Sequence, residues 1–177
     1  MRRQHRNSLV HYIHYNGPGV TVGGNFQRPD VVSTSESPMT ATISPELGHI
    51  HALLAERGYE VSESSPDSLT IREVDSGVSV HAVLQGEILF LSLTCTVVPR
   101  AAVTADIMAR MLAADNGIST SHFSLYDAAG GNVAITLSNF CKLQDLGADD
   151  EDDILSCVHF LLVDVMTARR VLAGLKA

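Results

Sequence analysis

Five consecutive acids, Asp149 to Asp153, lead into the apolar C-terminal segment and are the residues best suited to metal chemistry. Closely spaced carboxylates can bind Ca²⁺ or Mg²⁺ through their oxygens. A calcium loop of the helix–loop–helix type requires acids at alternate positions around a central glycine, followed by a distal glutamate. The segment ADDEDDILSC has neither feature, so it does not predict a calcium site.

The acidic run also fits a DDxxD spacing, which resembles the magnesium-binding motif of prenyl-diphosphate enzymes. Those enzymes are large helical bundles with a second acidic cluster, and this chain has no second cluster. The start of a helix explains the run directly, because carboxylates there meet unpaired N–H groups and the positive end of the helix dipole. Each contributes roughly 0.3–1 kcal/mol. Arg169 and Arg170 complete the charge pattern at the other end, so we interpret the run as a helix start.

Histidine, glycine and cysteine residues also lack the spacing of a known site. His11 and His14 have no third ligand nearby, while His49 and His51 lie two apart on a predicted helix and point in different directions. The pair Gly130–Gly131 joins two predicted strands and therefore indicates a hairpin turn rather than a phosphate loop. No zinc spacing connects the three cysteines, which are Cys95, Cys141 and Cys157. We predict no metal and no cofactor, and we read Cys95 and Cys157 as small buried hydrophobes.

An enzyme remains the alternative, with a catalytic or ligand site assembled from scattered residues such as His81, Tyr126 and Asp127. No nucleophile motif, paired carboxylates or ligand cluster supports it. The sequence therefore favours a non-enzymatic protein without catalytic residues.

Charge and composition restrict the partners. The formal net charge of −8 disfavours nucleic acid and anionic membranes, and 5% aromatic residues without tryptophan give little for base stacking. The longest apolar run, HFLLVDVM, is far shorter than the ~18 residues of a membrane span. Three widely separated cysteines are typical of a reduced chain. We expect a cytoplasmic protein whose partner is another protein.

Two regions are expected. Residues 1–38 are rich in Gly, Pro, Ser and Asn without periodicity, and we interpret them as a disordered or loosely attached tail, or as upstream sequence translated from an incorrect start. Four arginines and two acids give this region +2, so residues 39–177 carry −10 of the total of −8. That acidic domain would favour a client segment rich in Lys or Arg.

Hydrophobic periodicity predicts an α+β domain with the element order α-β-β-β-α-β-β-α. Three helices are expected, over 44–58, over 100–117 and from about 150 onward. Ser44 is the expected N-cap of the first and Gly58 its stop, and Asn116–Gly117 ends the second. Period-two alternation predicts a five-stranded antiparallel sheet from 68–74, 78–84, 88–95, 121–127 and 133–140. Its buried face in the second hairpin is expected to hold Phe123, Leu125, Val133, Ile135 and Leu137.

The second half of the chain carries a family resemblance. MLAADNG, HFSLYDAAGGNVAITLSNF and LGADDEDDILSCVHFLLVDV resemble the helix end, hairpin and acid-started final helix of the type III secretion chaperone-like fold, which includes the bacterial YbjN family. The resemblance covers roughly residues 44–175. It implies protein binding, because secretion chaperones are dimers that hold an extended client segment and YbjN-type proteins are linked to regulation.

Two surfaces follow from the patterns. The expected second helix is apolar on all sides, which predicts a homodimer through Val103, Ile107, Met108, Met111 and Leu112, unless the helix is simply buried in the monomer. The outward sheet face has little charge and presents Val83, Phe90 and Tyr126, which we expect to bind a client peptide. The alternative is that the final helix or the tail covers Phe90 and Tyr126.

Overall fold

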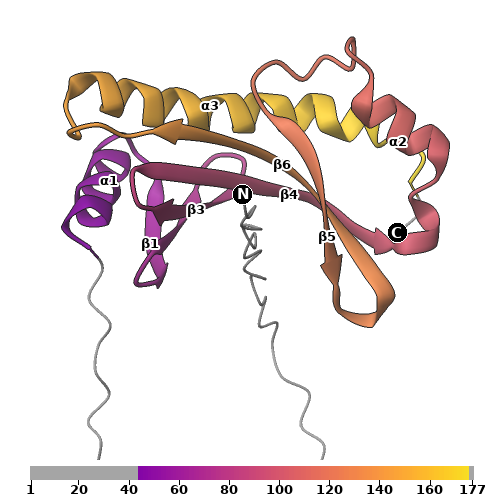
Figure 1. Cartoon of the computed structure of the whole chain (residues 1–177), viewed down its shortest axis with the longest axis horizontal. Coiled ribbons are helices and arrows are strands. Elements are labelled where there is room, and N and C mark those ends of the chain that lie inside the picture. The colour runs from indigo at the N-terminus through magenta and orange to yellow at the C-terminus, as the bar shows by residue number, and fades with distance from the viewer. Residues whose placement is uncertain (1–43, 176–177) are drawn as a thin grey trace, which may run out of the picture. The chain divides into compact units, whose positions relative to one another are not determined.

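The computed structural model describes residues 44–175, so the predictions for the tail, His11 and His14 lie outside the described residues. It shows an α+β domain in which a six-stranded antiparallel sheet carries helices on one face (Figure 1). The strand order across the sheet is β1-β2-β3-β4-β6-β5. The elements, in chain order, are α1 (Pro45–Glu56), β1 (Glu60–Ser65), β2 (Ser68–Arg72), β3 (Ser79–Gln85), β4 (Ile88–Pro99), α2 (Ala105–Leu112), β5 (His122–Ala128), β6 (Asn132–Lys142) and α3 (Ala148–Val171).

The predicted count of five strands is wrong, because an additional strand, β1, lies between α1 and β2. The observed order is therefore α-β-β-β-β-α-β-β-α. The sequence of β1, EVSESS, has no apolar alternation, and its side chains are almost all exposed. β1 is an edge strand that pairs only with β2, so its backbone hydrogen bonds form without a buried side-chain face.

Helix α1 begins and ends at the predicted residues. The Ser44 hydroxyl accepts a hydrogen bond from the Leu47 backbone N–H at 3.2 Å, and Pro45 occupies the first helical position. Gly58 follows the helix with a φ of +90°, a conformation that favours glycine. Leu47, Ile50, Leu53 and Leu54 form its buried side.

The second predicted helix is shorter than expected. Residues Arg100–Ala102 form a separate 3₁₀ turn, and α2 starts only after Thr104, whose hydroxyl accepts from the Ile107 N–H at 3.3 Å. The chain leaves the helical conformation at Ala113. Asn116 nevertheless has its expected capping role, because its side-chain amide donates to the Met111 carbonyl at 2.6 Å.

The acidic run does start a helix, since α3 begins at Ala148 with acids throughout its first turn. Asp150 differs from its neighbours because its side chain is buried. Its Oδ2 accepts backbone N–H bonds from Gln144, Asp145 and Leu146 at 2.8, 3.0 and 2.7 Å, which lowers the pKa of Asp150 below its usual value. This carboxylate therefore organises the loop before α3, including Leu146 with its positive φ of 56°.

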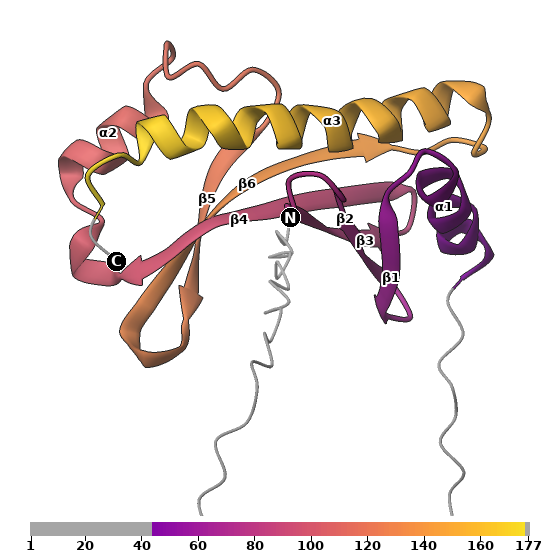
Figure 2. The same cartoon turned by 180° about the vertical axis from the view of Figure 1, so that it is seen from behind.

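All three helices cover the same sheet face. Figures 1 and 2 show α3 running along the sheet, with α1 beside its start and α2 beside its end. The main core joins α1 and α3 to β2, β3, β4 and β6, and a second cluster surrounds α2. Val133, Ile135 and Leu137 are buried as predicted, but Leu125 is exposed because β5 is an edge strand and no described helix covers its side chain. Within residues 44–175, no helix has the length and apolar character needed to cross a bilayer.

Candidate functional site

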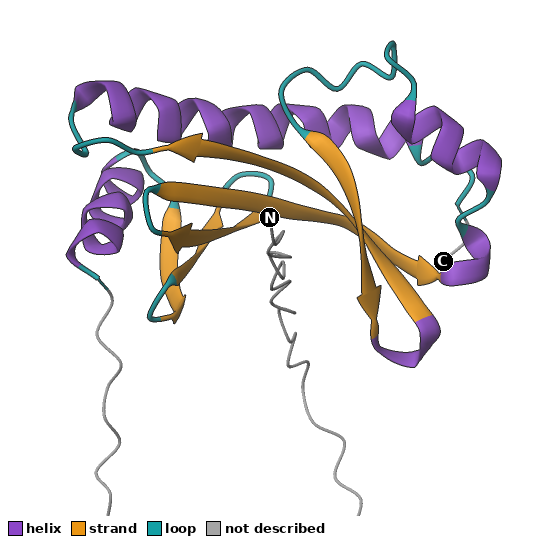
Figure 3. Ribbon diagram, viewed as in Figure 1, coloured by secondary structure: helices purple, strands orange, loops and turns teal. Residues whose placement is uncertain are grey.

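The sheet face opposite the helices, which we call the outer face, is the largest surface that the described elements leave uncovered (Figure 3). Strand registers align its side chains in rows across β2, β3, β4, β6 and β5. Most are small, polar and uncharged: Thr70, Ser79, His81, Ser92, Thr94, Ser124, Thr136 and Ser138. Hydroxyl groups of this kind can exchange hydrogen bonds with water for hydrogen bonds with a partner.

One row of the outer face is apolar. Val83 on β3 pairs with Phe90 on β4, and Phe90 pairs with Phe140 on β6. The two phenylalanine rings lie 6.2 Å apart between centroids, and Phe90 and Phe140 are 41% and 60% exposed. We call these three residues the phenylalanine row. Phe140 was not among the predicted binding residues, although the alternation Val133, Ile135, Leu137 assigns even-numbered positions of this strand to the outer face.

A second apolar group lies further along the same face. Val97 on β4 pairs with Ala134 on β6, which pairs with Tyr126 on β5. Tyr126 is 52% exposed and Val97 is 48% exposed. A β-bulge between Thr94 and Thr96 changes the alternation of β4, so that Val97 points outward while Val98 is buried. Seven residues of β4 separate Phe90 from Val97, which is about 23 Å along an extended strand.

The described chain itself covers part of the predicted dimer surface. Ile107 and Met111 are buried in the second core cluster with Val98, Ile135 and Leu172, so they serve the monomer core, as the alternative interpretation of a buried helix expected. Val103 is half-buried against the same cluster. Met108 and Leu112 point away from it, and Leu112 is 81% exposed.

The residues of the alternative enzyme site do not come together. His81 lies on β3 and Tyr126 and Asp127 on β5, with β4 and β6 between them, so at about 4.8 Å per strand they are far beyond hydrogen-bonding distance. Burial lowers the pKa of His81. Asp127 is paired with Arg100 instead. These three residues therefore form no shared site.

No group of three or more histidine, cysteine, aspartate or glutamate side chains within residues 44–175 has the arrangement needed to hold a metal ion. His49 and His51 are on α1, and His49 contacts the Glu151 carboxylate of α3 at 3.2 Å. This contact joins two helices and uses one acid of the acidic run.

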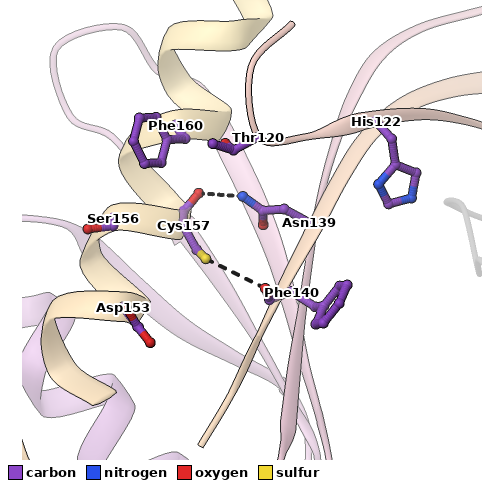
Figure 4. Close-up of a pocket in the computed structure, with 8 residues that line it drawn as sticks. All are labelled: Thr120, His122, Asn139, Phe140, Asp153, Ser156, Cys157 and Phe160. Atoms are coloured by element: carbon purple, nitrogen blue, oxygen red, sulfur yellow. Dashed lines mark hydrogen bonds between the residues drawn. The ribbon is translucent and has the colours of Figure 1, made fainter. Parts of the chain in front are cut away.

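An open hollow of about 380 Å³ lies between α3 and the end of β6 (Figure 4). The Asn139 side-chain amide donates to the Cys157 carbonyl at 2.9 Å, and the Cys157 sulfur lies 3.8 Å from the Phe140 carbonyl oxygen. Phe140 thus contributes its backbone to the hollow region and its ring to the outer face. The lining residues are Thr120, His122, Asn139, Phe140, Asp153, Ser156, Cys157 and Phe160.

Two solved structures are similar to this chain. YbjN from E. coli, a proposed transcription regulator, has 15% sequence identity and a TM-score of 0.51, covering 71% of this chain and 92% of YbjN. A chain of the heterodimeric ExoU–SpcU complex from the type III secretion system of Pseudomonas aeruginosa has 14% identity and a TM-score of 0.48, covering 70% of this chain and 98% of that chain. The predicted resemblance to this fold is confirmed.

Sequence comparisons add no relative. No family model matches the chain, and no curated protein matches it significantly. The similarity is therefore one of fold.

Proposed function

We propose that this domain is a non-enzymatic protein-binding module whose outer face holds an extended segment of a client or regulatory partner. The observation that carries the proposal is the phenylalanine row, in which two adjacent aromatic side chains are exposed on a sheet face that no described helix covers. Exposed apolar side chains within a polar field are typical of peptide-binding surfaces. The fold shared with YbjN supports a module of this size and architecture.

The exposed area of the row is large enough to contribute to affinity. A phenylalanine side chain offers about 200 Å², so the 60% exposed Phe140 leaves roughly 120 Å² available. At about 25 cal/mol per Å², complete burial of that area would contribute at most about 3 kcal/mol. Ordering the partner segment opposes this term, and we therefore expect each phenylalanine to contribute about 1–2 kcal/mol to binding.

The two apolar groups set the length of the partner segment. The phenylalanine row and the Val97–Tyr126 group are about 23 Å apart, which an extended peptide of about seven residues spans. Hydroxyl side chains lie between the two groups. A segment with apolar side chains near both ends and hydrogen-bonding groups between them would match this surface.

We also propose that the domain self-associates through the exposed part of α2. Leu112, at 81% exposure, and Met108 are apolar side chains that the monomer core does not use. Self-association would bury them and leave the outer face free for a partner. A homodimer of this kind agrees with the dimers implied by the chaperone-like resemblance.

The experiment places a photo-crosslinking amino acid at Phe140 in the native cell and identifies the adducts by mass spectrometry. We expect a discrete protein adduct, which Phe90→Asp weakens by about 5–30-fold in partner affinity because about 1–2 kcal/mol is lost. Circular dichroism should show that this variant remains folded, since the side chain is on an exposed face.

A matched control uses Val163, which is also exposed but lies on α3 in the other layer. Val163→Asp introduces the same charge and should leave the adduct unchanged. The proposal is wrong if Val163→Asp and Phe90→Asp weaken partner capture equally, or if Phe90→Asp unfolds the domain.

A further inference from the structure

Two cysteines that are sixteen positions apart in the sequence meet between β6 and α3. Cys141 lies on the helix-facing side of β6, where it pairs with Leu89 and is buried in the main core. Cys157 lies in the second turn of buried residues on α3 and is only partly buried. Both thiols are free. This pair is independent of the partner-binding surface proposed above.

Local contacts hold the two sulfurs together. The Cys157 sulfur is 3.8 Å from the carbonyl oxygen of Phe140, which belongs to the peptide bond that joins Phe140 to Cys141. The Asn139 side chain donates to the Cys157 carbonyl at 2.9 Å and so fixes this part of α3 against β6. The two thiols are hydrogen-bonded to each other. A disulfide between them therefore requires side-chain rotation rather than movement of an element.

The environments of the two sulfurs differ in a way that assigns them different roles. Cys157 lines the open hollow of Figure 4, where a small oxidant can reach it, whereas Cys141 is behind it in the core. The hydrogen bond from Cys141 lowers the pKa of Cys157, and the same bond together with burial raises the pKa of Cys141. The accessible sulfur has the greater thiolate character, which is the form that reacts with peroxides.

We propose that Cys157 and Cys141 form an oxidation site for hydroperoxides, with Cys157 as the attacking thiol and Cys141 as the resolving thiol. The Cys157 thiolate attacks the terminal peroxide oxygen, the O–O bond breaks, and Cys157 becomes a sulfenic acid while water or an alcohol leaves after protonation. The Cys141 sulfur then attacks the sulfenic sulfur, the S–O bond breaks, and water leaves with the Cys141 proton. Two thiols are oxidised by two electrons and one peroxide is reduced.

The product would be an intramolecular disulfide that fastens α3 to β6 next to the phenylalanine row. Residues 142–156, which include the Asp150-organised loop, would lie inside the closed ring. Such a bond restricts the unfolded chain and should raise the melting temperature of the oxidised protein.

The test treats the reduced full-length protein with hydrogen peroxide and maps the products. We expect the monomer to lose the mass of two hydrogen atoms, two of its three thiols to disappear, and dithiothreitol to restore both. A peptide map without reductant should show Cys141 joined to Cys157. Cys95, whose pKa burial raises to about 11, should react about tenfold more slowly with peroxide.

Three results would overturn the proposal: a bridge that includes Cys95, a disulfide between two chains, or Cys157 oxidised to the sulfinic acid while Cys141 stays a free thiol. Cys95→Ser is the matched control, and it should still lose two thiols. Cys157→Ser should keep its thiols at the same peroxide dose. The map of the unsubstituted protein decides the matter if a cysteine variant fails to fold.

Discussion

The sharpest stability prediction compares two apolar residues of α2 that are five positions apart. Ile107 is buried with Val98, Met111, Ile135 and Leu172, whereas Leu112 is 81% exposed. Ile107→Ala removes buried methyl groups and leaves a cavity, which costs about 2–4 kcal/mol. Leu112→Ala removes a similar amount of hydrocarbon from an exposed position and should change stability by less than about 0.5 kcal/mol.

Urea denaturation of the purified domain measures both effects. With a slope of about 1–3 kcal/mol per molar urea, Ile107→Ala should lower the transition midpoint by about 1–2 M and Leu112→Ala by a few tenths at most. Light scattering of the same samples over a range of concentrations adds the second readout. Because we propose that Leu112 lies in a self-association surface, Leu112→Ala should reduce the average mass, and Ile107→Ala should not do so while the protein is folded.

Either of two results would refute this reasoning. If Leu112→Ala lowers the midpoint as much as Ile107→Ala, α2 presents the opposite side to the core. If the unsubstituted protein has a monomer mass at micromolar concentration, the proposed dimer is wrong, although the assignment of Ile107 to the core would stand.

Three further predictions concern other parts of the chain. Because three backbone donors lower the pKa of Asp150, its carboxylate contributes stability that is present above about pH 4 and lost as the pH falls through the lowered value; urea titrations should show a smaller loss between about pH 5 and 2 for Asp150→Asn than for the unsubstituted protein. Ser121→Ala deprives the buried Asp164 of its 2.7 Å donor and should cost about 1–3 kcal/mol by chemical denaturation, more than Ser119→Ala, whose hydroxyl is 3.5 Å away. Deleting residues 1–38 should change the melting temperature by no more than about two degrees by calorimetry, and a larger drop would contradict the expectation of a loosely attached tail.

Local signals predicted most of the fold. The N-cap at Ser44, the alternation in β2, β3 and β4 and the acid-rich start of α3 each depend on neighbouring residues, and all appear in the structure. β1 was missed because an exposed edge strand needs no apolar side chains: its stability comes from backbone pairing with β2. The burial of Asp150 was missed for a similar reason, since its donors come from a loop whose conformation has no sequence pattern.

The candidate binding surface was predicted in part. Alternation placed Phe90 and Tyr126 on the outer face, and both are exposed there. Val97 could not be placed in this way, because the bulge before it inserts one residue and reverses the alternation. The pairing of Phe90 with Phe140 depends on the register between β4 and β6, which are separated in sequence by α2 and β5. Strand alternation indicates which side chains point outward, but it does not indicate which ones become neighbours.

The distribution of charge on the sheet specifies what the outer face can bind. Its ion pairs are at the margins: Arg72 with Glu60 at the β1–β2 edge, Lys142 with Glu87 at one end, and Arg100 with Asp127 at the other. Between them the outward side chains of the described strands are uncharged or histidine, so a partner segment would displace water from hydroxyls and aromatic rings rather than from charges. Removing water from a charge costs several kcal/mol, while a hydroxyl can form a new hydrogen bond with a peptide. We therefore expect the part of the partner that contacts the outer face to be uncharged. The lysines or arginines that an acidic domain favours would then flank this part and increase the rate of association more than the affinity.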